Sequence, residues 1–318
     1  METKDMDRNN VNLAFVNYLS RSGSTFLCRL LDEYEEVSVG IEAGFPGAIH
    51  RLIPVDYEEI SDDHTLKRYL DELFGDIRFQ EWKIDREVLF RKLKSGGYPL
   101  TFKDILLNCM IEYFGDATAK VFVHKAGYYI DILEDVQKTF GDTKNIFVIR
   151  DPRAIYNSQK NASCLYTGKA MGHSLPYFVW QYRKRARIVE KNKGAKNLFC
   201  IRYENLIENT QDVVAATLRF LEVRGGKKKK AGGYGDKIPA NQQKLHTNVT
   251  SAPNRKSLEK WKTGLRKDEI LFIQNRLSRE MSAMNYVPVS LSGLSGKEWL
   301  AYIRTELTYR ILQVKMLR

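Results

Sequence analysis

Short apolar segments alternate along the chain with segments in which apolar residues recur every three or four positions. Residues 11–19 form such an apolar run, which predicts a strand, and the spacing at residues 24–34 predicts a helix directly after it. The pair recurs three times, with strands predicted at 119–124, 145–149 and 197–201 and helices at 128–140, from Pro152 onwards and at 212–221. Strands separated by helices form parallel sheets covered on both faces. The pattern therefore predicts a three-layer α/β/α fold with a central parallel sheet.

Three segments lie outside this alternation. Residues 50–117 are predicted to be helical and polar, an insertion or cap within a single domain that spans residues 1–318. Residues 224–241 combine glycines with the run Lys227–Lys230, which predicts a flexible, solvated basic loop. The apolar spacing at residues 267–284 predicts one packing helix.

The last segment, residues 297–318, is predicted to be an amphipathic helix. Its apolar side chains fall on one stripe, formed by Trp299, Ile303, Leu307, Ile311 and Val314. Such a helix can pack on its own domain, form the seam of a homodimer or lie on a membrane surface. Packing on the domain is favoured because it is the commonest role of such helices, and a homodimer stays open.

Composition and charge limit the class of protein. Of the 318 residues, 43% are hydrophobic and 28% charged, the balance of a soluble globular protein. A formal net charge of +12 indicates an anionic partner: a nucleic acid, a membrane surface or a phosphate-bearing small molecule. The four cysteines form no CxxC pair, which excludes a disulfide framework and a zinc site of that type. The polar N-terminus and the lack of an apolar run as long as a membrane span predict a cytoplasmic protein.

The first candidate site is the stretch SRSGST at residues 20–25, between a predicted strand and a predicted helix. Small residues let backbone N–H groups face an anion, and the helix N-terminus adds the positive end of its dipole. Ser22, Ser24 and Thr25 add hydroxyl groups, and Arg21 adds a fixed positive charge. The pattern GxxxxGK[ST] is absent from the sequence. The stretch therefore predicts a phosphate cradle that is not a nucleoside triphosphatase loop.

Two further candidate sites follow later strands. In RDPRAIYNSQ, Arg150 leaves a strand and Ser158 lies about two helical turns further on, so the two side chains can share one anion. In RYENL, Tyr203 follows the next strand and can stack on a base. Anion sites and an aromatic residue at the carboxyl ends of parallel strands predict a nucleotide site.

These three motifs, in this order, resemble the family of sulfotransferases that use 3′-phosphoadenosine 5′-phosphosulfate (PAPS). The motif style is nearest to bacterial and tyrosylprotein-type members, and the resemblance covers roughly residues 12–285, including the pair Lys260-Trp261. It implies a nucleotide-kinase-like fold, PAPS as donor and 3′,5′-bisphosphoadenosine (PAP) as product. The implied phosphosulfate contacts are Arg21, Ser22, Gly23, Ser24, Thr25 and Phe26. The resemblance also places Arg150 and Ser158 at the 3′-phosphate, Tyr203 beside the adenine and an unassigned donor contact within residues 250–256.

The resemblance also implies the catalytic groups. Sulfuryl transfer is expected to proceed in line, as phosphoryl transfer does, so it needs a cation at the leaving oxygen and a base for the acceptor proton. Glu42 lies where family members carry a glutamate base, and Lys125 resembles the lysine at the bridging oxygen. His124 is the reserve base, because adjacent strand residues point to opposite faces and only one of the two is expected to reach the site. No metal is expected.

The acceptor is predicted to be a small-molecule metabolite with a hydroxyl or amine group. A carbohydrate or polysaccharide is the alternative, since Lys227–Lys230 and Arg183–Arg187 can contact an anionic acceptor. The aromatic stretch 175–182 and the region around Trp82 can line an acceptor pocket. A nucleotide or sugar kinase is an alternative of another class, whereas a nucleic-acid-binding protein is disfavoured because no reading element is evident.

Overall fold

The computed structural model of the chain describes residues 12–42, 59–114, 119–127, 129–141, 143–163, 171–229, 233–238 and 255–316. The chain divides into two compact units. The first consists of residues 1–17, 24–146 and 211–240, and the second of residues 18–23, 147–210 and 241–318.

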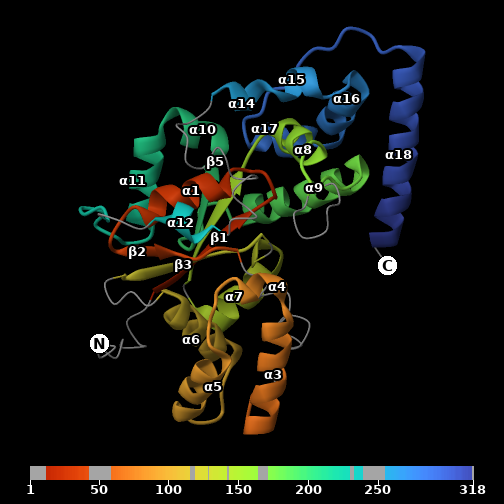
Figure 1. Cartoon of the computed structure of the whole chain (residues 1–318). Coiled ribbons are helices and arrows are strands. Elements are labelled where there is room, and N and C mark those ends of the chain that lie inside the picture. Colours follow the sequence, from red (N-terminus) through yellow and green to blue (C-terminus); the bar gives the residue numbers. More distant parts are fainter. Residues whose placement is uncertain are drawn as a thin grey trace. The chain divides into compact units, whose positions relative to one another are not determined.

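Five strands form the central sheet, in the order β2-β3-β1-β4-β5 (Figure 1). Their bounds are β1 Asn12–Tyr18, β2 Val37–Val39, β3 Val121–Lys125, β4 Lys144–Ile149 and β5 Leu198–Arg202. β3 lies between β1 and β2 and is parallel to both, with Phe15 opposite His124 and Val39 opposite Val123. The predicted α/β fold with a central parallel sheet is confirmed.

Helices precede or follow each strand along the chain. Those of the first unit are α1 Ser24–Asp32, α3 Asp63–Gly75, α4 Ile77–Gln80, α5 Arg86–Ser95, α6 Phe102–Phe114, η2 Tyr129–Ile132, α7 Leu133–Phe140, α11 Thr210–Phe220 (whose first residue falls in the second unit) and α12 Tyr234–Lys237. Those of the second are α8 Pro152–Lys160, α9 Leu175–Lys191, α10 Tyr203–Glu208, α14 Lys256–Glu259, α15 Trp261–Gly264, α16 Lys267–Arg276, α17 Ser278–Ala283 and α18 Gly296–Met316.

In the first unit, the region predicted as a helical insertion contains α3 to α6. Aspartates cap three of these helices: Asp62, Asp76 and Asp85 each accept a hydrogen bond from a backbone N–H of the first turn. Such caps satisfy amide groups that have no partner inside the helix. Residues 50–58 and 115–117 of the predicted insertion lie outside the described residues.

The described lysines of the basic run are ion-paired. Lys227, Lys228 and Lys229 reach Glu35, Glu33 and Asp32, in that order, and Lys230 lies outside the described residues. The innermost pair is the most buried: the Lys229 side chain is 17% exposed and that of Asp32 is fully buried. Asp32 also accepts from the Val39 amide and from Lys237. The positive charges of Lys227–Lys229, which were predicted to be solvated, are therefore compensated by carboxylates at the end of α1.

In the second unit, a buried arginine joins α8 to α15 and α16. Arg153 pairs with Asp151 and donates a hydrogen bond of 2.8 Å to Gln274. Its guanidinium lies 4.0 Å from the ring centre of Trp261, which belongs to the Lys260-Trp261 pair singled out in the sequence. Trp261 is buried and therefore has a packing role here.

Two predictions in the second unit need correction. The helix predicted over residues 267–284 is two helices, because Leu277 (φ −113°, ψ 18°) leaves helical geometry between α16 and α17. The apolar spacing continues through this break, so periodicity alone did not show it. The aromatic stretch 175–182 lies in α9, where Leu175, Phe178 and Tyr182 are buried among core residues and only part of the stretch can line a pocket: Trp180 borders a cavity between α9 and α18.

Candidate functional site

The loop between β1 and α1 has the backbone of a tight anion cradle. Arg21 and Gly23 have positive φ angles of 72° and 95°. A Cβ atom at Gly23 would lie 2.1 Å from the Tyr203 ring, so only glycine fits beneath this ring. Ser22 is fully buried, and its Oγ has no hydrogen-bond partner among the described residues. A buried hydroxyl of this kind suits an acceptor such as a phosphate or sulfate oxygen.

Four of the predicted donor-site residues meet in the second unit. Arg21 donates from Nε to Ser158 Oγ over 3.0 Å. Arg150 donates from Nη1 to the Arg21 carbonyl (3.2 Å), and its guanidinium lies 4.5 Å from the ring centre of Tyr203. Its Nη2 donates to the carbonyl of Ser257 over 2.8 Å. Three motifs that are distant in sequence thus form one cluster, which we call the guanidinium cluster: Arg21, Arg150, Ser158 and Tyr203.

The electrostatics of the guanidinium cluster favour an anion. Burial lowers the pKa of the Arg21 guanidinium, and the adjacent charge of Arg150 lowers it further. Arg150 donates two hydrogen bonds to backbone carbonyls, which are neutral and leave its charge uncompensated. The neighbouring carboxylates have other partners, since Asp151 pairs with Arg153 and Glu204 accepts from the Asp151 amide and from Tyr286. A bound phosphate would offset the repulsion between the two arginines.

The residues predicted to do chemistry lie in the first unit. Glu42 follows β2, and its carboxylate lies 2.8 Å from Arg78 Nη1 and 3.5 Å from Lys125 Nζ. The Lys125 side chain is 5% exposed, whereas that of Glu42 is 34% exposed. Arg78 was not identified from the sequence, because an arginine at the start of a short helix carries no signal of its own. Glu42 is thus held by two cations and remains accessible.

Trp82 positions the segment that leads to Glu42. It is buried, and its indole N–H donates to the carbonyl of Ile41 over 3.3 Å. Its ring stacks on Tyr113 with 4.3 Å between ring centres. The region around Trp82 was expected to line an acceptor pocket, but the Trp82 side chain itself packs against Tyr113 and the backbone that follows β2.

His124 lies in the core of the first unit. It is fully buried, with Nδ1 3.2 Å from the Tyr129 hydroxyl and its ring edge-on to Trp82. Burial lowers the pKa of His124 to about 3. A general base works best when its pKa lies near the working pH. This environment favours Glu42 over His124 as the proton acceptor.

The buried histidine predicts a specific dependence of stability on pH. Its ordinary pKa of 6.5 applies to the unfolded chain, so the unfolded state takes up the proton first as pH falls. Stability contributed by the neutral form is complete above pH 6.5 and is lost at about 1.4 kcal/mol per pH unit as pH falls toward the folded value. His124→Phe, which keeps an aromatic ring, should lack this slope in urea unfolding. Parallel curves for the two proteins would show that His124 titrates like an exposed histidine.

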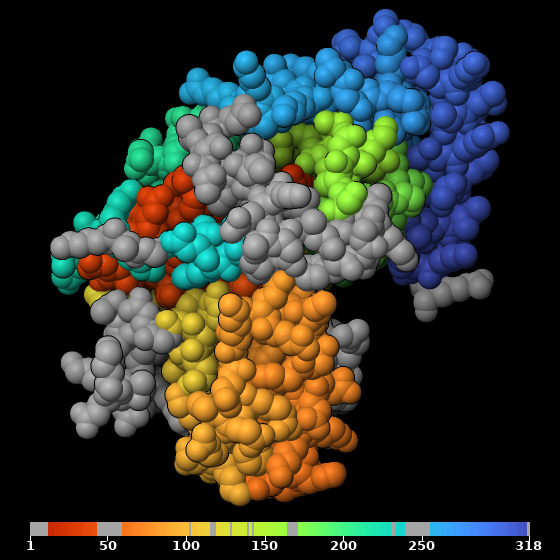
Figure 2. All heavy atoms as spheres, viewed as in Figure 1, coloured from red at the N-terminus to blue at the C-terminus, as the bar shows by residue number. Residues whose placement is uncertain are grey.

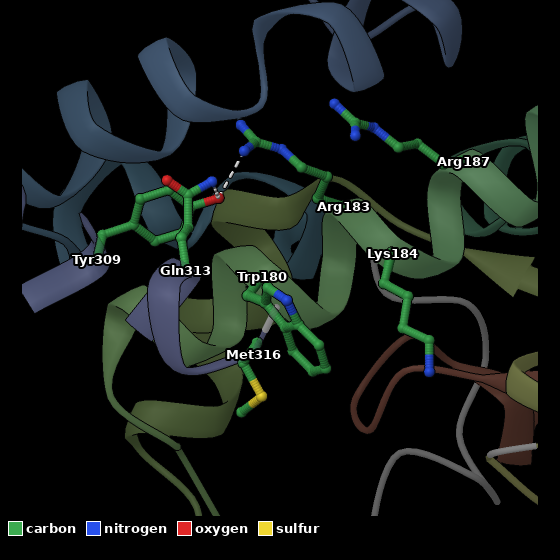
Figure 3. Close-up of a pocket in the computed structure, with 7 residues that line it drawn as sticks. All are labelled: Trp180, Arg183, Lys184, Arg187, Tyr309, Gln313 and Met316. Atoms are coloured by element: carbon green, nitrogen blue, oxygen red, sulfur yellow. Dashed lines mark hydrogen bonds between the residues drawn. The ribbon is translucent and has the colours of Figure 1, made fainter. Parts of the chain in front are cut away.

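A cavity of about 450 Å³ lies in the second unit between α9 and α18 (Figure 3). Its lining is Trp180, Arg183, Lys184, Arg187, Tyr309, Gln313 and Met316. None of these is a predicted donor-site or catalytic residue, whereas Trp180 and the basic residues of α9 lie in segments predicted to contact an acceptor. Arg183 donates to the Tyr309 hydroxyl, and both Arg183 and Arg187 pair with the buried Glu280. Arg183 and Arg187 therefore connect α9 to α17, and Arg183 also connects it to α18.

The described residues hold neither a metal-type cluster nor a membrane-spanning helix. No group of three or more His, Cys, Asp or Glu side chains in this part of the chain could hold a metal ion. None of its helices is long and apolar enough to cross a bilayer.

Comparison with known proteins identifies the family. The profile of the sulfotransferase family matches residues 14–225, two thirds of the chain, and this range contains every site residue that was predicted by number. The unassigned donor contact predicted within residues 250–256 lies beyond it, and residues 250–254 lie outside the described residues. The chain belongs to the sulfotransferase family. The resemblance stated from the three motifs is thereby confirmed at the level of the family.

Two solved structures show that this sulfotransferase shares its fold with known members. The sulfotransferase domain of the Synechococcus PCC 7002 olefin synthase has a TM-score of 0.56 and 15% sequence identity, over 87% of this chain and 95% of that domain. The sulfotransferase domain from the curacin biosynthetic pathway has a TM-score of 0.54 and 16% identity, over 87% and 99%. A search of curated proteins gives no match.

Proposed function

We propose that this sulfotransferase transfers a sulfuryl group from PAPS to a hydroxyl or amine group of a small-molecule metabolite in the cytoplasm, without a metal. The observation that carries the proposal is the guanidinium cluster. Its two adjacent arginines, one of them with a pKa lowered by burial and by the other charge, suit a nucleotide that bears an additional phosphate. The Tyr203 ring beside Arg150 offers a surface on which an adenine can stack.

The chain supplies separate groups for the two ends of the donor. Arg150 and Ser158 would hold the 3′-phosphate, and Tyr203 would lie beside the adenine. Ser22, with its buried hydroxyl, and residues 23–26 at the start of α1 would hold the 5′ end, where the helix N-terminus presents free amide groups. The donor itself supplies the activated sulfuryl group.

Glu42 and Lys125 have complementary roles in the transfer. Glu42 would accept the proton of the attacking hydroxyl or amine, and its partial exposure leaves it open to an acceptor. Lys125 is nearly buried and would stabilise the charge that develops on the leaving oxygen. Arg78 would keep the Glu42 carboxylate oriented through its 2.8 Å contact, and we class it as a positioning residue.

The structure favours a small acceptor over a polysaccharide. Binding a sulfated or carboxylated chain needs cations whose charge is not already compensated. Lys227–Lys229 pair with carboxylates at the end of α1, and Arg183 and Arg187 pair with Glu280. Five of the cations that could contact such a chain, Lys227, Lys228, Lys229, Arg183 and Arg187, therefore already have carboxylate partners. The biosynthetic origin of the two structural relatives is consistent with this acceptor class.

A transfer assay tests the proposal. The protein is incubated with 35S-labelled PAPS and a panel of alcohols, phenols, amines and a desulfated polysaccharide, and labelled products and released PAP are measured. We expect labelled product from a small alcohol or amine and none from the polysaccharide. Phosphoryl transfer from ATP with magnesium to any of these acceptors would instead support the kinase alternative, which family membership disfavours.

A further inference from the structure

The C-terminal helix carries most of the exposed apolar surface of the described residues. Nine large apolar side chains are exposed in this part of the chain, and seven of them belong to α18: Trp299, Leu300, Ile303, Leu307, Ile311, Val314 and Met316. Five of these, Trp299, Ile303, Leu307, Ile311 and Val314, recur at three- to four-residue spacing, and together with the adjacent Leu300 they form a single stripe, which we call the outer stripe. Contiguous exposed apolar surface of this kind marks an interaction site.

The opposite face of α18 fixes the helix to the second unit. Tyr309 is fully buried, and its hydroxyl accepts a hydrogen bond from Arg183 of α9 (Figure 3). Glu306 pairs with Arg276 of α16, and Tyr302 accepts from Asn275. The packing that was predicted for this helix therefore involves another face, and the described residues of the second unit leave the outer stripe exposed. Figure 2 shows α18, in dark blue, at the margin of this unit.

The charges around the outer stripe have one sign. Over the whole described length of α18, four basic residues are exposed: Lys297, Arg304, Arg310 and Lys315. Both acidic residues of the helix are partly exposed and have partners: Glu298 accepts from the Ser295 amide, and Glu306 pairs with Arg276 and with Arg310. Lys297, Arg304 and Lys315 are left as exposed cations without a carboxylate partner among the described residues. The exposed face of α18 is therefore apolar and basic, and both carboxylates of the helix already have partners.

We propose that α18 binds the surface of an anionic membrane, with the outer stripe in the headgroup–acyl boundary and the basic side chains on lipid phosphates. Helices that bind in this way combine Trp and Leu on one face with Lys and Arg along its edge. A helix of 21 residues is about 32 Å long, which gives the stripe room to lie along the surface. Six charged residues along its length keep it from spanning the bilayer.

Charge also argues against a second copy of the chain as the occupant. Two α18 helices that faced each other would bring both sets of basic side chains together, and the carboxylates of each helix already have partners. Like charges along a helix pair disfavour association, whereas the lipid surface supplies the opposite charge. The same residues that repel a second copy thus attract an anionic bilayer.

Vesicle flotation with the full chain tests this proposal. The probes are neutral phosphatidylcholine vesicles and vesicles in which about a third of the lipid is phosphatidylglycerol, at low and high salt. We expect binding only to the anionic vesicles, weakened by salt because surface charges are screened. Equal binding to both kinds of vesicle, or binding to neither, would overturn the proposal.

Three variants separate the contributions. Ile303→Gln with Leu307→Gln should lower the partition coefficient by about tenfold or more. Arg304→Gln with Lys315→Gln should lower it by about fivefold for each charge. Ile77→Gln is the matched control, an exposed apolar residue of the first unit (59% exposed), and should bind like wild type.

Sedimentation of the same proteins measures their oligomeric state and so tests whether a second copy of the chain binds the outer stripe. Retained PAP binding would show that the α18 variants fold. A dimer that dissociates in Ile303→Gln/Leu307→Gln, together with no vesicle binding by wild type, would assign the stripe to a second copy and overturn the membrane proposal. A monomeric wild-type protein that floats with anionic vesicles would support it.

Discussion

Replacing Glu42 with glutamine should lower kcat by about 10²- to 10⁴-fold and leave the affinity for PAP nearly unchanged. The amide keeps the size of the side chain and can still accept a hydrogen bond from Arg78, but it cannot take up the acceptor's proton. The expected loss is therefore confined to the chemical step. Steady-state release of PAP in the presence of acceptor, together with calorimetry of PAP binding, measures the two quantities separately.

Glu35→Gln is the matched control for Glu42→Gln. Glu35 is also a partly exposed glutamate near α1 that pairs with a cation, in this case Lys227. The control should keep the wild-type kcat, because an exposed ion pair contributes little to stability or structure. A Glu42→Gln protein with nearly wild-type kcat would show that another group accepts the proton.

Replacing Arg150 with alanine should weaken PAP binding by about 10- to 150-fold, the loss expected for a charge-assisted hydrogen bond worth about 1.5–3 kcal/mol. The affinity for 5′-AMP should change far less, because AMP lacks the 3′-phosphate that Arg150 is proposed to contact. Arg150→Lys should recover only part of the loss, since a lysine restores the charge but not the planar contact with Tyr203. Calorimetric titration of both nucleotides gives the comparison.

Arg202→Ala serves as the control for Arg150→Ala. Arg202 is likewise an arginine at the end of a strand, and its guanidinium lies 4.6 Å from the ring centre of Tyr286, as that of Arg150 lies on Tyr203. The control variant should bind PAP like wild type. If Arg150→Ala loses the same affinity for PAP and for 5′-AMP, Arg150 supports the loop that contains Arg21 and does not contact the 3′-phosphate.

The strands and the donor motifs were predictable because their signals are local. The four predicted strands, β1, β3, β4 and β5, are short apolar runs, whereas β2 is only three residues long. Each motif occupies a few consecutive residues at a strand end, as RDPRA does after β4. Parallel strands place such ends at one edge of a sheet. This rule led from three separate motifs to the expectation that Arg21, Arg150, Ser158 and Tyr203 share one site, and the structure brings these four together.

The partners of charged side chains could not be predicted, because they depend on contacts distant in sequence. Arg78 meets Glu42 across 36 positions, and neither residue has a local pattern that indicates the other. The lysine run looked like a solvated loop because its partner Asp32 lies almost two hundred positions away. The burial of individual side chains could not be predicted either. His124 is a plausible base in the sequence, whereas its burial in the structure lowers its pKa to about 3.

Calorimetric titration of the wild-type protein decides whether this sulfotransferase uses a nucleotide with a 3′-phosphate. PAP, 5′-AMP and ATP with magnesium are titrated under the same conditions. The expected result is that PAP binds at least about tenfold more tightly than 5′-AMP, because only PAP carries the second phosphate that Arg150 and Ser158 are proposed to hold. ATP with magnesium that binds as tightly as PAP, or more tightly, would contradict it.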